Sequence, residues 1–526
     1  MLKLLSFITC CLLSTMSFAQ NNAVGIFQNH ADVGRPKNAG ASTYEQATQT
    51  YHLKGGGSNI WFNRDEFHYL YNKLQGDFIL TANFEFIGKG VDPHRKIGWM
   101  VRESADESAA SMNAVIHGDG LTVLQWRPIR GAFMRDPQDE IFYPKKTPFQ
   151  VIQLERTGKK MIMRVANWGE PLQEVGSHEL PDMPDAVLAG LFISSHNPDV
   201  VEEARVWNVR IDKPVASIYH PNPQIQKTLP KNQPVLGCRL ETMTIADGKR
   251  KVILESPERF EAPNWMPGGK KLLYNGGGAI YTIPVTGGTP EKLNTGSVTR
   301  INNDHGISFN GKQLAISGGR EGVAGGSYIY VLQLQGGTPK LITEKSPSYW
   351  HGWAPNNKDV AFVAQRDGAK IYNIYKADVT TRKEVALTKN TSGHVDGPEY
   401  SPDGKYIYYN ANPTGTMQLW RMKPDGTGKE QLTFDENHNW FPHLSPDGKW
   451  IAYISFPTDI DPDAHPFYQR VTLRLMPVNG GAPRVIAYLY GGQGTLNVNS
   501  WSPDSKSIAF VSNSQVAEPA STEKTK

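Results

Sequence analysis

The chain has 526 residues, of which 39% are hydrophobic and 20% charged, an ordinary globular composition with enough length for two domains. Its 55 basic and 51 acidic residues give a net charge of +4, a balance that makes no electrostatic case for binding nucleic acid or an anionic membrane. The 50 glycines, 36 prolines and 10% aromatic residues favour strands and turns over helices.

The first nineteen residues follow the pattern of an export signal. Lys3 supplies a positive start, residues 4–13 are apolar, and Ser17-Phe18-Ala19 forms a small-x-small cleavage site. The alternative is a membrane anchor, but the apolar run is shorter than the roughly 18 residues that a spanning helix needs. We therefore expect residues 1–19 to be a cleaved signal peptide and the mature protein to be periplasmic or secreted, with no transmembrane segment.

Cysteine usage is sparse. Cys10 and Cys11 lie inside the predicted signal peptide, so Cys238 is the only thiol of the mature chain. No intrachain disulfide can form, and the hydrophobic cores alone must hold the exported protein together.

Residues 20–212 are rich in predicted strands. Residues 77–88 alternate apolar and polar side chains, residues 149–166 form a hairpin through Thr157-Gly158, and residues 186–197 and 202–211 are two apolar strands. No segment of normal helix length has a convincing apolar stripe. We predict a β-sandwich of two packed sheets.

The closing strands of this first domain resemble those of concanavalin-like or laminin-G-like jelly rolls, a resemblance that implies carbohydrate binding. Aromatic rings stack on sugars and charged groups bind hydroxyls, whereas the alternative places the same aromatic residues in the core and the charges in solvent. The candidate sugar contacts are Trp61, His68, Trp99, Arg102, His117, Asp119, Trp126 and Arg127.

Residues 213–235 are dense in proline and have no hydrophobic period. Such a segment is semi-rigid, so we predict a linker that packs along one of the two domains.

A turn motif, Ser-Pro-Asp-Gly-Lys or a relative of it, recurs six times after this linker. Proline presets its own φ angle and Asp-Gly tolerates a tight reversal, so each copy predicts a turn between two strands. Most intervals between copies lie roughly in the mid-forties, the size of a β-propeller blade. The apolar residues that precede the turns are Trp265, Ile307, Trp353, Tyr400, Leu444 and Trp501.

The last copy ends after Ser512, before its two outer strands. Residues 239–254, upstream of the first copy, read as a strand, an Asp-Gly turn and a strand. We expect them to complete the last blade, because this closes the ring and leaves no open sheet edge. The sequence thus predicts an all-β fold: a jelly-roll-like sandwich, then a six-bladed propeller over residues 236–515, closed by strands from its own N-terminal end, then a polar tail at 516–526.

The repeat resembles the WD40-like PD40 repeats of the TolB family, the periplasmic partner in the Tol–Pal system. The resemblance covers roughly residues 236–515 and implies a propeller fold. It also implies a role as a protein-interaction scaffold with an envelope protein as partner. Residues 20–212 do not resemble the N-terminal domain of TolB.

In a blade of four up-and-down strands, the start of the first strand and the loop between the second and third strands lie on one face. Residues 455–470 add a long loop to that face, and loops that lengthen on a rigid scaffold usually carry function. The opposite face receives only the repeated turns. The predicted ligand-binding residues are Asn302, Asp304, His305, Trp350, His351, Asp396, Trp440, His443, Gln493 and Asn497, and the same face receives Asn303, Tyr349, His394 and, from the long loop, His465.

Three functions are compatible with this set. The first is a cup that binds a glycan, another envelope component or the loop of an envelope protein. The second is a metal site formed by His305, His351, His443 and Gln493, since imidazole and amide ligands suit Mn, Zn or Fe. It resembles oligogalacturonate lyases and implies a metal-dependent carbohydrate-active enzyme, a lyase or a hydrolase. The third is purely structural, with polar channel residues hydrogen-bonded to one another.

Overall fold

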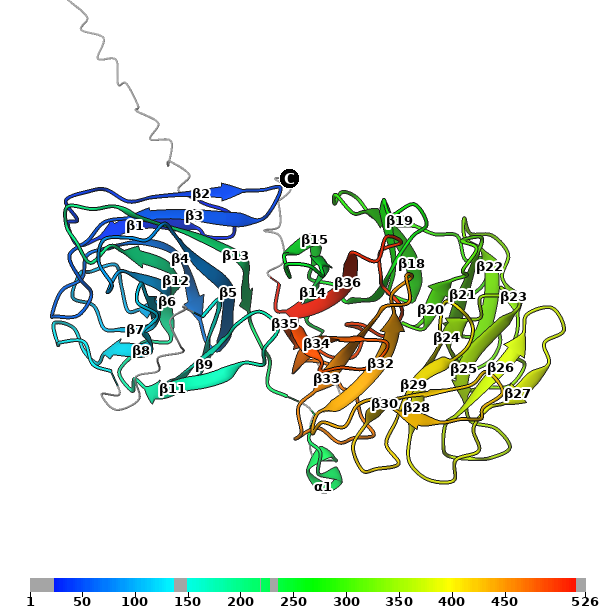
Figure 1. Cartoon of the computed structure of the whole chain (residues 1–526). Helices are drawn as coiled ribbons and strands as arrows, with labels where there is room; N and C mark the ends of the chain where they lie inside the picture. Colours follow the sequence, from blue (N-terminus) through cyan, green and yellow to red (C-terminus); the bar gives the residue numbers. More distant parts are fainter. Residues whose placement is uncertain (1–22, 137–148, 218, 228–234, 517–526) are drawn as a thin grey trace, which may run out of the picture.

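A computed structural model describes residues 23–136, 149–217, 219–227 and 235–516. The predicted signal peptide and residues 517–526 of the tail lie outside the described residues. Nearly all regular structure in the described residues is β-strand, and one four-residue helix, α1 (Pro223–Gln226), lies in the proline-rich segment (Figure 1). No helix in this part of the chain is long and apolar enough to cross a bilayer. The predicted all-β class is therefore confirmed.

The first thirteen strands form two antiparallel sheets, drawn in blue to cyan-green in Figure 1. The six-stranded sheet has the order β1 (Asn29–Val33), β4 (Phe67–Gln75), β12 (Ala186–Ser194), β6 (Lys96–Arg102), β7 (Ser111–His117) and β8 (Thr122–Arg127). The seven-stranded sheet has the order β11 (Gln173–Glu179), β10 (Lys160–Ala166), β9 (Val151–Thr157), β5 (Phe78–Ile87), β13 (Glu202–Asp212), β3 (Thr50–Gly55) and β2 (Ala41–Glu45).

One apolar core joins these two sheets. Alternate residues of β5, Leu80 and Phe84 among them, are buried in the same cluster as Trp99 of β6. The Trp99 Nε1–H donates a hydrogen bond to the Ile152 carbonyl at 3.2 Å, so the indole bridges from one sheet to the other. The alternation along β5 predicts this burial because successive side chains of a strand point to opposite faces.

The second half of the chain forms six further sheets, which follow one another in green, yellow, orange and red in Figure 1. Five are four-stranded meanders in chain order, and the sixth has three strands in the order β15-β14-β36. The strands are β14 (Gly237–Thr244), β15 (Arg250–Ser256), β16 (Phe260–Trp265), β17 (Lys271–Gly276), β18 (Ala279–Pro284), β19 (Glu291–Lys292), β20 (His305–Ile307), β21 (Gln313–Gly318), β22 (Tyr328–Gln333), β23 (Lys340–Leu341), β24 (Ser348–Trp353), β25 (Asp359–Ala364), β26 (Asn373–Asp378), β27 (Glu384–Ala386), β28 (Val395–Tyr400), β29 (Ile407–Ala411), β30 (Gln418–Met422), β31 (Glu430–Gln431), β32 (His438–Leu444), β33 (Trp450–Phe456), β34 (Gln469–Pro477), β35 (Arg484–Gly491) and β36 (Ser507–Ser514).

The last strand pairs with the first strand of this second half. β14 and β36 are antiparallel partners from Gly237–Ser514 to Thr244–Ser507, and Trp501 forms a bridge with Ile508 of β36. The predicted joining of residues 239–254 to the sheet that follows Trp501 is confirmed. This pairing covers an edge of β36 that would otherwise be open.

The repeated turn owes its fixed sequence to its hydrogen bonds. Ser445 Oγ donates to Asp447 Oδ1 at 2.6 Å and accepts the Trp450 N–H at 3.0 Å, while the Gly448 N–H donates to the Ser445 carbonyl. Ser401 and Ser502 repeat this arrangement. The last residue of the turn has a positive φ in all six copies, at Gly269, Gly311, Asn357, Gly404, Gly448 and Ser505.

The proline-rich segment lies against the second half of the chain. The Val215 N–H donates to the Tyr490 hydroxyl at 3.2 Å, and the Tyr219 hydroxyl accepts the Asp461 N–H at 2.8 Å. A third hydrogen bond, from the Leu236 N–H to the Tyr468 hydroxyl, follows at the end of the segment. The prediction that this linker packs along one domain is confirmed for the described residues.

Buried ion pairs connect the two halves. Glu241 of β14 is fully buried and accepts hydrogen bonds from Arg210 of β13, from Arg250 of β15 and from Ser512 of β36. Since β13 belongs to the first half and the other strands to the closing sheet, this single carboxylate ties the first half to the sheet that joins both ends of the second.

Candidate functional site

A cavity of about 290 Å³ lies where the first strands of the repeats begin, and we call it the start-side cavity. Asp304 immediately precedes β20, His351 lies in β24, Asp396 lies in β28, and residues 493–497 follow β35. Six of the ten predicted ligand-binding residues line it: Asn302, Asp304, His351, Asp396, Gln493 and Asn497. The sequence argument from strand starts therefore locates much of this lining.

Asp396 is the centre of the charged groups in the cavity. Its Oδ1 lies 2.8 Å from His351 Nε2 and accepts the Gly397 N–H at 2.8 Å. Its Oδ2 faces His394 Nε2 at 3.7 Å and His465 Nε2 at 3.9 Å. Three imidazoles from β24, from the start of β28 and from the long loop after β33 thus surround one carboxylate.

This arrangement separates charge inside the cavity. Burial by itself would raise the pKa of Asp396, but His351 and His394 outweigh it and hold that pKa well below its usual range. Burial opposes protonation of His351, yet the Asp396 carboxylate outweighs it and raises the pKa of His351. Asp396 and His351 therefore form a buried ion pair in which the carboxylate is ionised.

Asp304 behaves differently from Asp396. Burial raises the pKa of Asp304 to about 7, and the negative charge of Asp396 adds to this, although His351 opposes both effects. At neutral pH the cavity therefore contains one ionised carboxylate and one carboxyl group that is partly protonated. Tyr349 and Tyr372, whose pKa values burial raises, remain neutral hydroxyl donors beside them.

Four of the predicted residues do not line the start-side cavity, and Trp440 and His305 are two of them. Trp440 is fully buried, with its ring centroid 4.5 Å from that of His465. His305 is also fully buried; its Nδ1 lies 3.1 Å from the Asn303 carbonyl, and burial lowers its pKa to about 3. Both side chains are packed in the interior next to lining residues and do not themselves line the start-side cavity.

His443 and Trp350 are the other two corrections. The His443 ring lies between Glu399, 2.7 Å from Nδ1, and the Leu496 carbonyl, 3.1 Å from Nε2, so both nitrogens are occupied. A bulge between Trp440 and His443 moves this residue off the expected register. Trp350 packs against Gly306, where a Cβ atom would lie 2.0 Å from the indole, and it lines a cavity at the other end of the strands.

The predicted metal set is not assembled. Of His305, His351, His443 and Gln493, only His351 and Gln493 line the cavity. Within the described ranges, no group of three or more His, Cys, Asp or Glu side chains has the geometry of a metal site. The four residues therefore do not fit Mn, Zn or Fe, because equivalent positions in successive sheets do not share one orientation once a bulge intervenes.

Sequence reasoning missed part of the lining. Tyr372 lies in the loop between β25 and β26, the second and third strands of their sheet. The sequence predicts that such loops lie on this face, so the aromatic residue in this loop could have been recognised as a candidate. Phe441 gave no such signal, because its φ of 55° follows from the bulge in β32. The other polar or aromatic lining residues, Asn303, Tyr349, His394 and His465, are ones that the sequence placed on this face without naming them as ligands.

Most sugar-contact candidates of the first half are interior residues. Arg102 and Arg127 are fully buried and both bind the Asp65 carboxylate, at 2.8 and 2.6 Å. Trp99 is in the core, and His68 is buried beside Asp32. His117 is buried, Trp126 stacks on His178 with 3.8 Å between ring centroids, and Asp119 and Trp61 lie in connecting segments. The alternative that the aromatic residues are core holds for Trp99, whereas Arg102 and Arg127 lie neither at a sugar-binding surface nor in solvent but are buried on Asp65.

Comparison with known proteins identifies the second half of the chain. A family model described as TolB beta propeller domain matches residues 324–460. A relative from Agrobacterium fabrum named "Uncharacterized protein Atu1656" is 43% identical over 273 residues, 52% of this chain and 91% of the relative. A solved structure from Agrobacterium tumefaciens, whose assignment as TolB is provisional, is 42% identical with a TM-score of 0.51, and it covers 53% of this chain and 99% of its own.

The Tol-Pal system protein TolB of Francisella tularensis is more distant. It is 27% identical over 186 residues, which are 32% of this chain and 40% of that protein, so the similarity spans less than half of its length. The 43% identity over nearly all of the Agrobacterium fabrum relative is the stronger finding. Through its second half, the chain belongs to the TolB β-propeller family.

Proposed function

We propose that this chain is an exported TolB-like protein that binds a glycan or another cell-envelope component in the start-side cavity. In this proposal the six sheets of the second half are the blades of a closed six-bladed propeller over residues 236–515. Residues 20–212 form a lectin-like accessory domain of the concanavalin or laminin-G type. Binding through two domains of one chain would raise avidity for a ligand that spans them.

The lining of the start-side cavity carries the proposal. Amide groups of Asn302, Asn303, Gln493 and Asn497, two tyrosine hydroxyls and the charged pair around Asp396 all converge on about 290 Å³. Phe441 adds an aromatic surface. Hydroxyl-rich ligands are recognised by such donor and acceptor pairs together with an aromatic face.

Two polar groups of the cavity still have hydrogen-bonding capacity. Asn303 Nδ2 and His394 Nε2 are buried and make no hydrogen bond within 3.5 Å in the described structure. Buried polar groups nearly always have a partner, which is either protein, water or a ligand. A sugar hydroxyl is a partner of the right chemistry for both donors.

The test is calorimetric titration with three defined saccharides: tetra-N-acetylchitotetraose, trigalacturonate and the N-acetylglucosaminyl-N-acetylmuramyl disaccharide of peptidoglycan. We expect at least one to bind, and Tyr372→Phe, which removes one hydroxyl, to weaken that binding by about fivefold to tenfold. Tyr281→Phe, on β18 away from the cavity, is the matched control. Absence of binding by all three, or equal binding by Tyr372→Phe and wild type, would contradict the proposal.

A second candidate function is a reaction on that glycan. The pKa values of Asp304 and Asp396 are displaced in opposite directions, as expected for a general acid beside an ionised carboxylate. Mass spectrometry of the same saccharides after incubation distinguishes the two: products that disappear in Asp304→Asn, with binding retained, would make this an enzyme. A scaffold that binds an envelope protein is the remaining alternative, and it is supported only by the name of the Francisella relative.

A further inference from the structure

A second cavity, of about 440 Å³, lies at the opposite ends of the same first strands, and we call it the turn-side cavity. The sequence led us to expect nothing but repeated turns on this face. The apolar residues that precede the turns line it from all six repeats: Trp265, Ile307, Trp353, Tyr400, Leu444 and Trp501. Except for His351, its lining is distinct from that of the start-side cavity.

Four tryptophans line the turn-side cavity, and only two of their N–H groups have a hydrogen-bond partner in the described structure. Trp353 Nε1–H donates to the Gly306 carbonyl and Trp501 Nε1–H donates to the His443 carbonyl, each at 3.0 Å. The Nε1–H groups of Trp265 and Trp350 are buried, and neither has a hydrogen-bond partner within the described residues.

The turn-side cavity also contains one free acceptor. Asn264 is 4% exposed and its Oδ1 accepts no hydrogen bond in the described structure. Trp350, also 4% exposed, is a second buried lining residue whose polar group has no partner within the described residues. Because such groups are rarely left unpaired, a ligand that accepts from indole N–H groups and donates to an amide oxygen would complete this wall.

Glu399, the one carboxylate that lines the turn-side cavity, is already engaged. Its oxygens accept from the Leu444 N–H at 2.9 Å and from Asn499 Nδ2 at 2.7 Å, and His443 Nδ1 lies 2.7 Å away. It therefore has little capacity left to bind a ligand cation.

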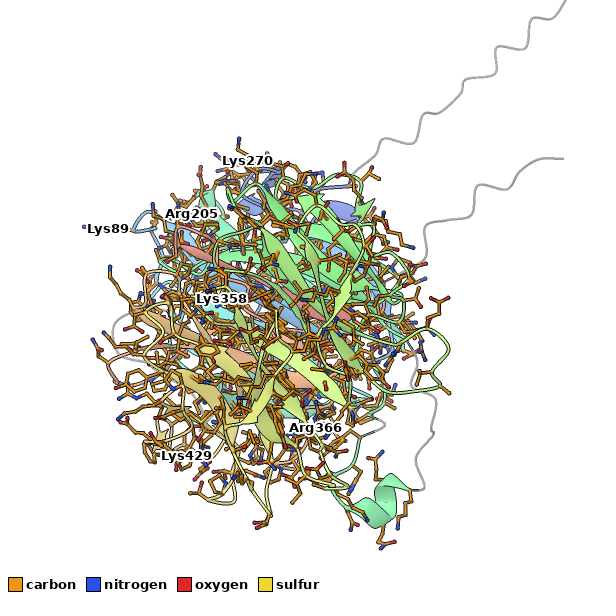
Figure 2. All side chains as sticks on the ribbon, turned by 90° about the vertical axis from the view of Figure 1, so that its right-hand side faces the viewer. Lys89, Arg205, Lys270, Lys358, Arg366 and Lys429 are labelled. Carbon is orange, nitrogen blue, oxygen red and sulfur yellow. The ribbon has the colours of Figure 1, made fainter. Side chains whose placement is uncertain are left out.

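The repeated turns that border this cavity carry charged residues, lysines in all six copies and aspartates at Asp403, Asp447 and Asp504. Each turn is followed by an exposed lysine: Lys270, Lys312, Lys358, Lys405, Lys449 and Lys506. Lys405 and Lys449 pair with the aspartate of their own turn, whereas the other four form no ion pair within 4.0 Å in the described structure. Lys270 and Lys358 are labelled in Figure 2, which views the molecule from the side of the six sheets.

We infer that the turn-side cavity is a second ligand site, which takes a planar aromatic anion that also carries an N–H or O–H donor. The aromatic body packs among the indoles, the anionic group accepts from the unpaired Trp265 N–H, and the donor binds Asn264 Oδ1. Size permits this, because an apolar cavity of about 150 Å³ already admits benzene and this one is about 440 Å³. Aromatic walls favour a flat ligand through stacking.

The probe is 8-anilinonaphthalene-1-sulfonate, which combines a naphthalene ring, a sulfonate and an N–H donor, and whose fluorescence rises in an apolar site. We expect one saturable site per chain. Trp265→Phe, which keeps a ring and removes the N–H, should weaken binding at least fivefold. The double variant Lys312→Gln, Lys358→Gln should weaken it about as much and reduce its salt dependence.

Controls separate this site from adventitious binding of the probe. Lys160→Gln and Trp126→Phe, both in the first half of the chain, should bind like wild type. Ile307→Trp, which fills the cavity, should abolish binding with the melting temperature unchanged; if it unfolds the protein, Trp265→Phe decides. Several sites per chain, or equal binding by wild type and Trp265→Phe, would overturn the inference. Neither result depends on saccharide binding at the start-side cavity.

Discussion

At the scale of single residues, position within a cavity decides what a carboxyl group can do. Asp396 and Asp304 both line the start-side cavity, yet their pKa values move in opposite directions. Asp396 has His351 at 2.8 Å and two more imidazoles within 4 Å, whereas Asp304 has burial and a neighbouring negative charge. Two aspartates in one cavity therefore differ in protonation: Asp396 is an ionised hydrogen-bond acceptor, and Asp304 is a partly protonated carboxyl group.

Asp304→Asn should stabilise the protein increasingly as the pH rises. The pKa of Asp304 is raised to about 7 in the folded state, so between about pH 4 and 7 the unfolded chain loses this proton first and stability falls as the pH rises. Asparagine carries no such cost, and three pKa units correspond to an upper limit of about 4 kcal/mol. Urea unfolding of variant and wild type at pH 5 and pH 8 measures the difference.

The control for this experiment is Asp367→Asn, an exposed aspartate whose φ of 54° asparagine also tolerates. It should show no trend with pH. If the stability difference between Asp304→Asn and wild type is the same at both pH values, Asp304 is not the group whose ionisation burial opposes.

At the scale of elements, the repeated turn determines where each pair of strands begins and ends. One serine side chain both donates to an aspartate and accepts the N–H that starts the next strand, so the turn is held from inside. The third repeat has Ala354 at this place and uses Asn356 and Asn357 instead, which shows that the φ angle is kept while the side-chain bonds vary. The bulges at Trp350 and Trp440 act on the same first strands and turn individual side chains toward one end or the other.

Ser445→Ala should cost about 1 to 2 kcal/mol of unfolding free energy. The substitution leaves the partly buried Trp450 N–H without its acceptor and the Asp447 carboxylate without its hydroxyl donor. Chemical denaturation monitored by fluorescence measures it. Ser392→Ala, in an exposed loop, should change stability by less than about 0.5 kcal/mol. Equal effects of the two substitutions would show that the Ser445 side chain does not stabilise the turn.

At the scale of the whole molecule, one sheet unites both halves of the chain. β14 and β15 complete the sheet of β36, and Glu241 of β14 binds Arg210 of β13 in the same buried cluster. Glu155 and Arg470 form a further ion pair between the halves, and Gly169 forms a bridge with Val485. The ends of the second half are therefore joined at the place where the first half docks.

Glu241→Gln should destabilise the protein by about 3 to 5 kcal/mol, because it leaves two buried arginines without their carboxylate. Arg210 and Arg250 outweigh burial and hold the pKa of Glu241 below its usual value of 4.5. The stabilisation is thus present at neutral pH and is lost as the pH falls below about 4.5. Calorimetry should show two transitions for the variant in place of one, since the junction between the halves is weakened.

Glu203→Gln is the matched control, because Glu203 also belongs to β13 but pairs with Lys54 at the surface with 42% of its side chain exposed. Exposed pairs contribute less than about 1 kcal/mol. If Glu203→Gln and Glu241→Gln destabilise the protein equally, the buried cluster does not hold the halves together.

Local chemistry accounts for how far the sequence could predict this fold. The turn is held by hydrogen bonds within six residues, as in residues 445–450, and the alternation along residues 78–86 involves a single strand. Both could therefore be predicted without tertiary information. The pairing of β14 with β36 followed from an incomplete last repeat. The six predicted residues that line the start-side cavity stand just before or within a first strand, or after β35, where the repeat fixes their place.

The remaining assignments depended on contacts between distant residues. The sequence predicted His443 as a ligand, but Glu399 of β28 and the Leu496 carbonyl, in the segment after β35, occupy both of its ring nitrogens. The sequence predicted Arg102 and Arg127 as surface residues that contact a sugar, but both form buried ion pairs with the Asp65 carboxylate.

The sequence by itself determined the β-class, the repeated turn, the strand that closes the last sheet and the face on which polar residues gather. The β-class and the turn follow from hydrogen bonds and side-chain alternation within a few residues, and the closing strand follows from the incomplete last repeat. Only the tertiary structure decided which side chains open into which of the two cavities, and which of two aspartates keeps its proton. Burial and charge at those positions depend on groups that other sheets bring close, such as His351 beside Asp396 and Asp304, and no local pattern encodes them.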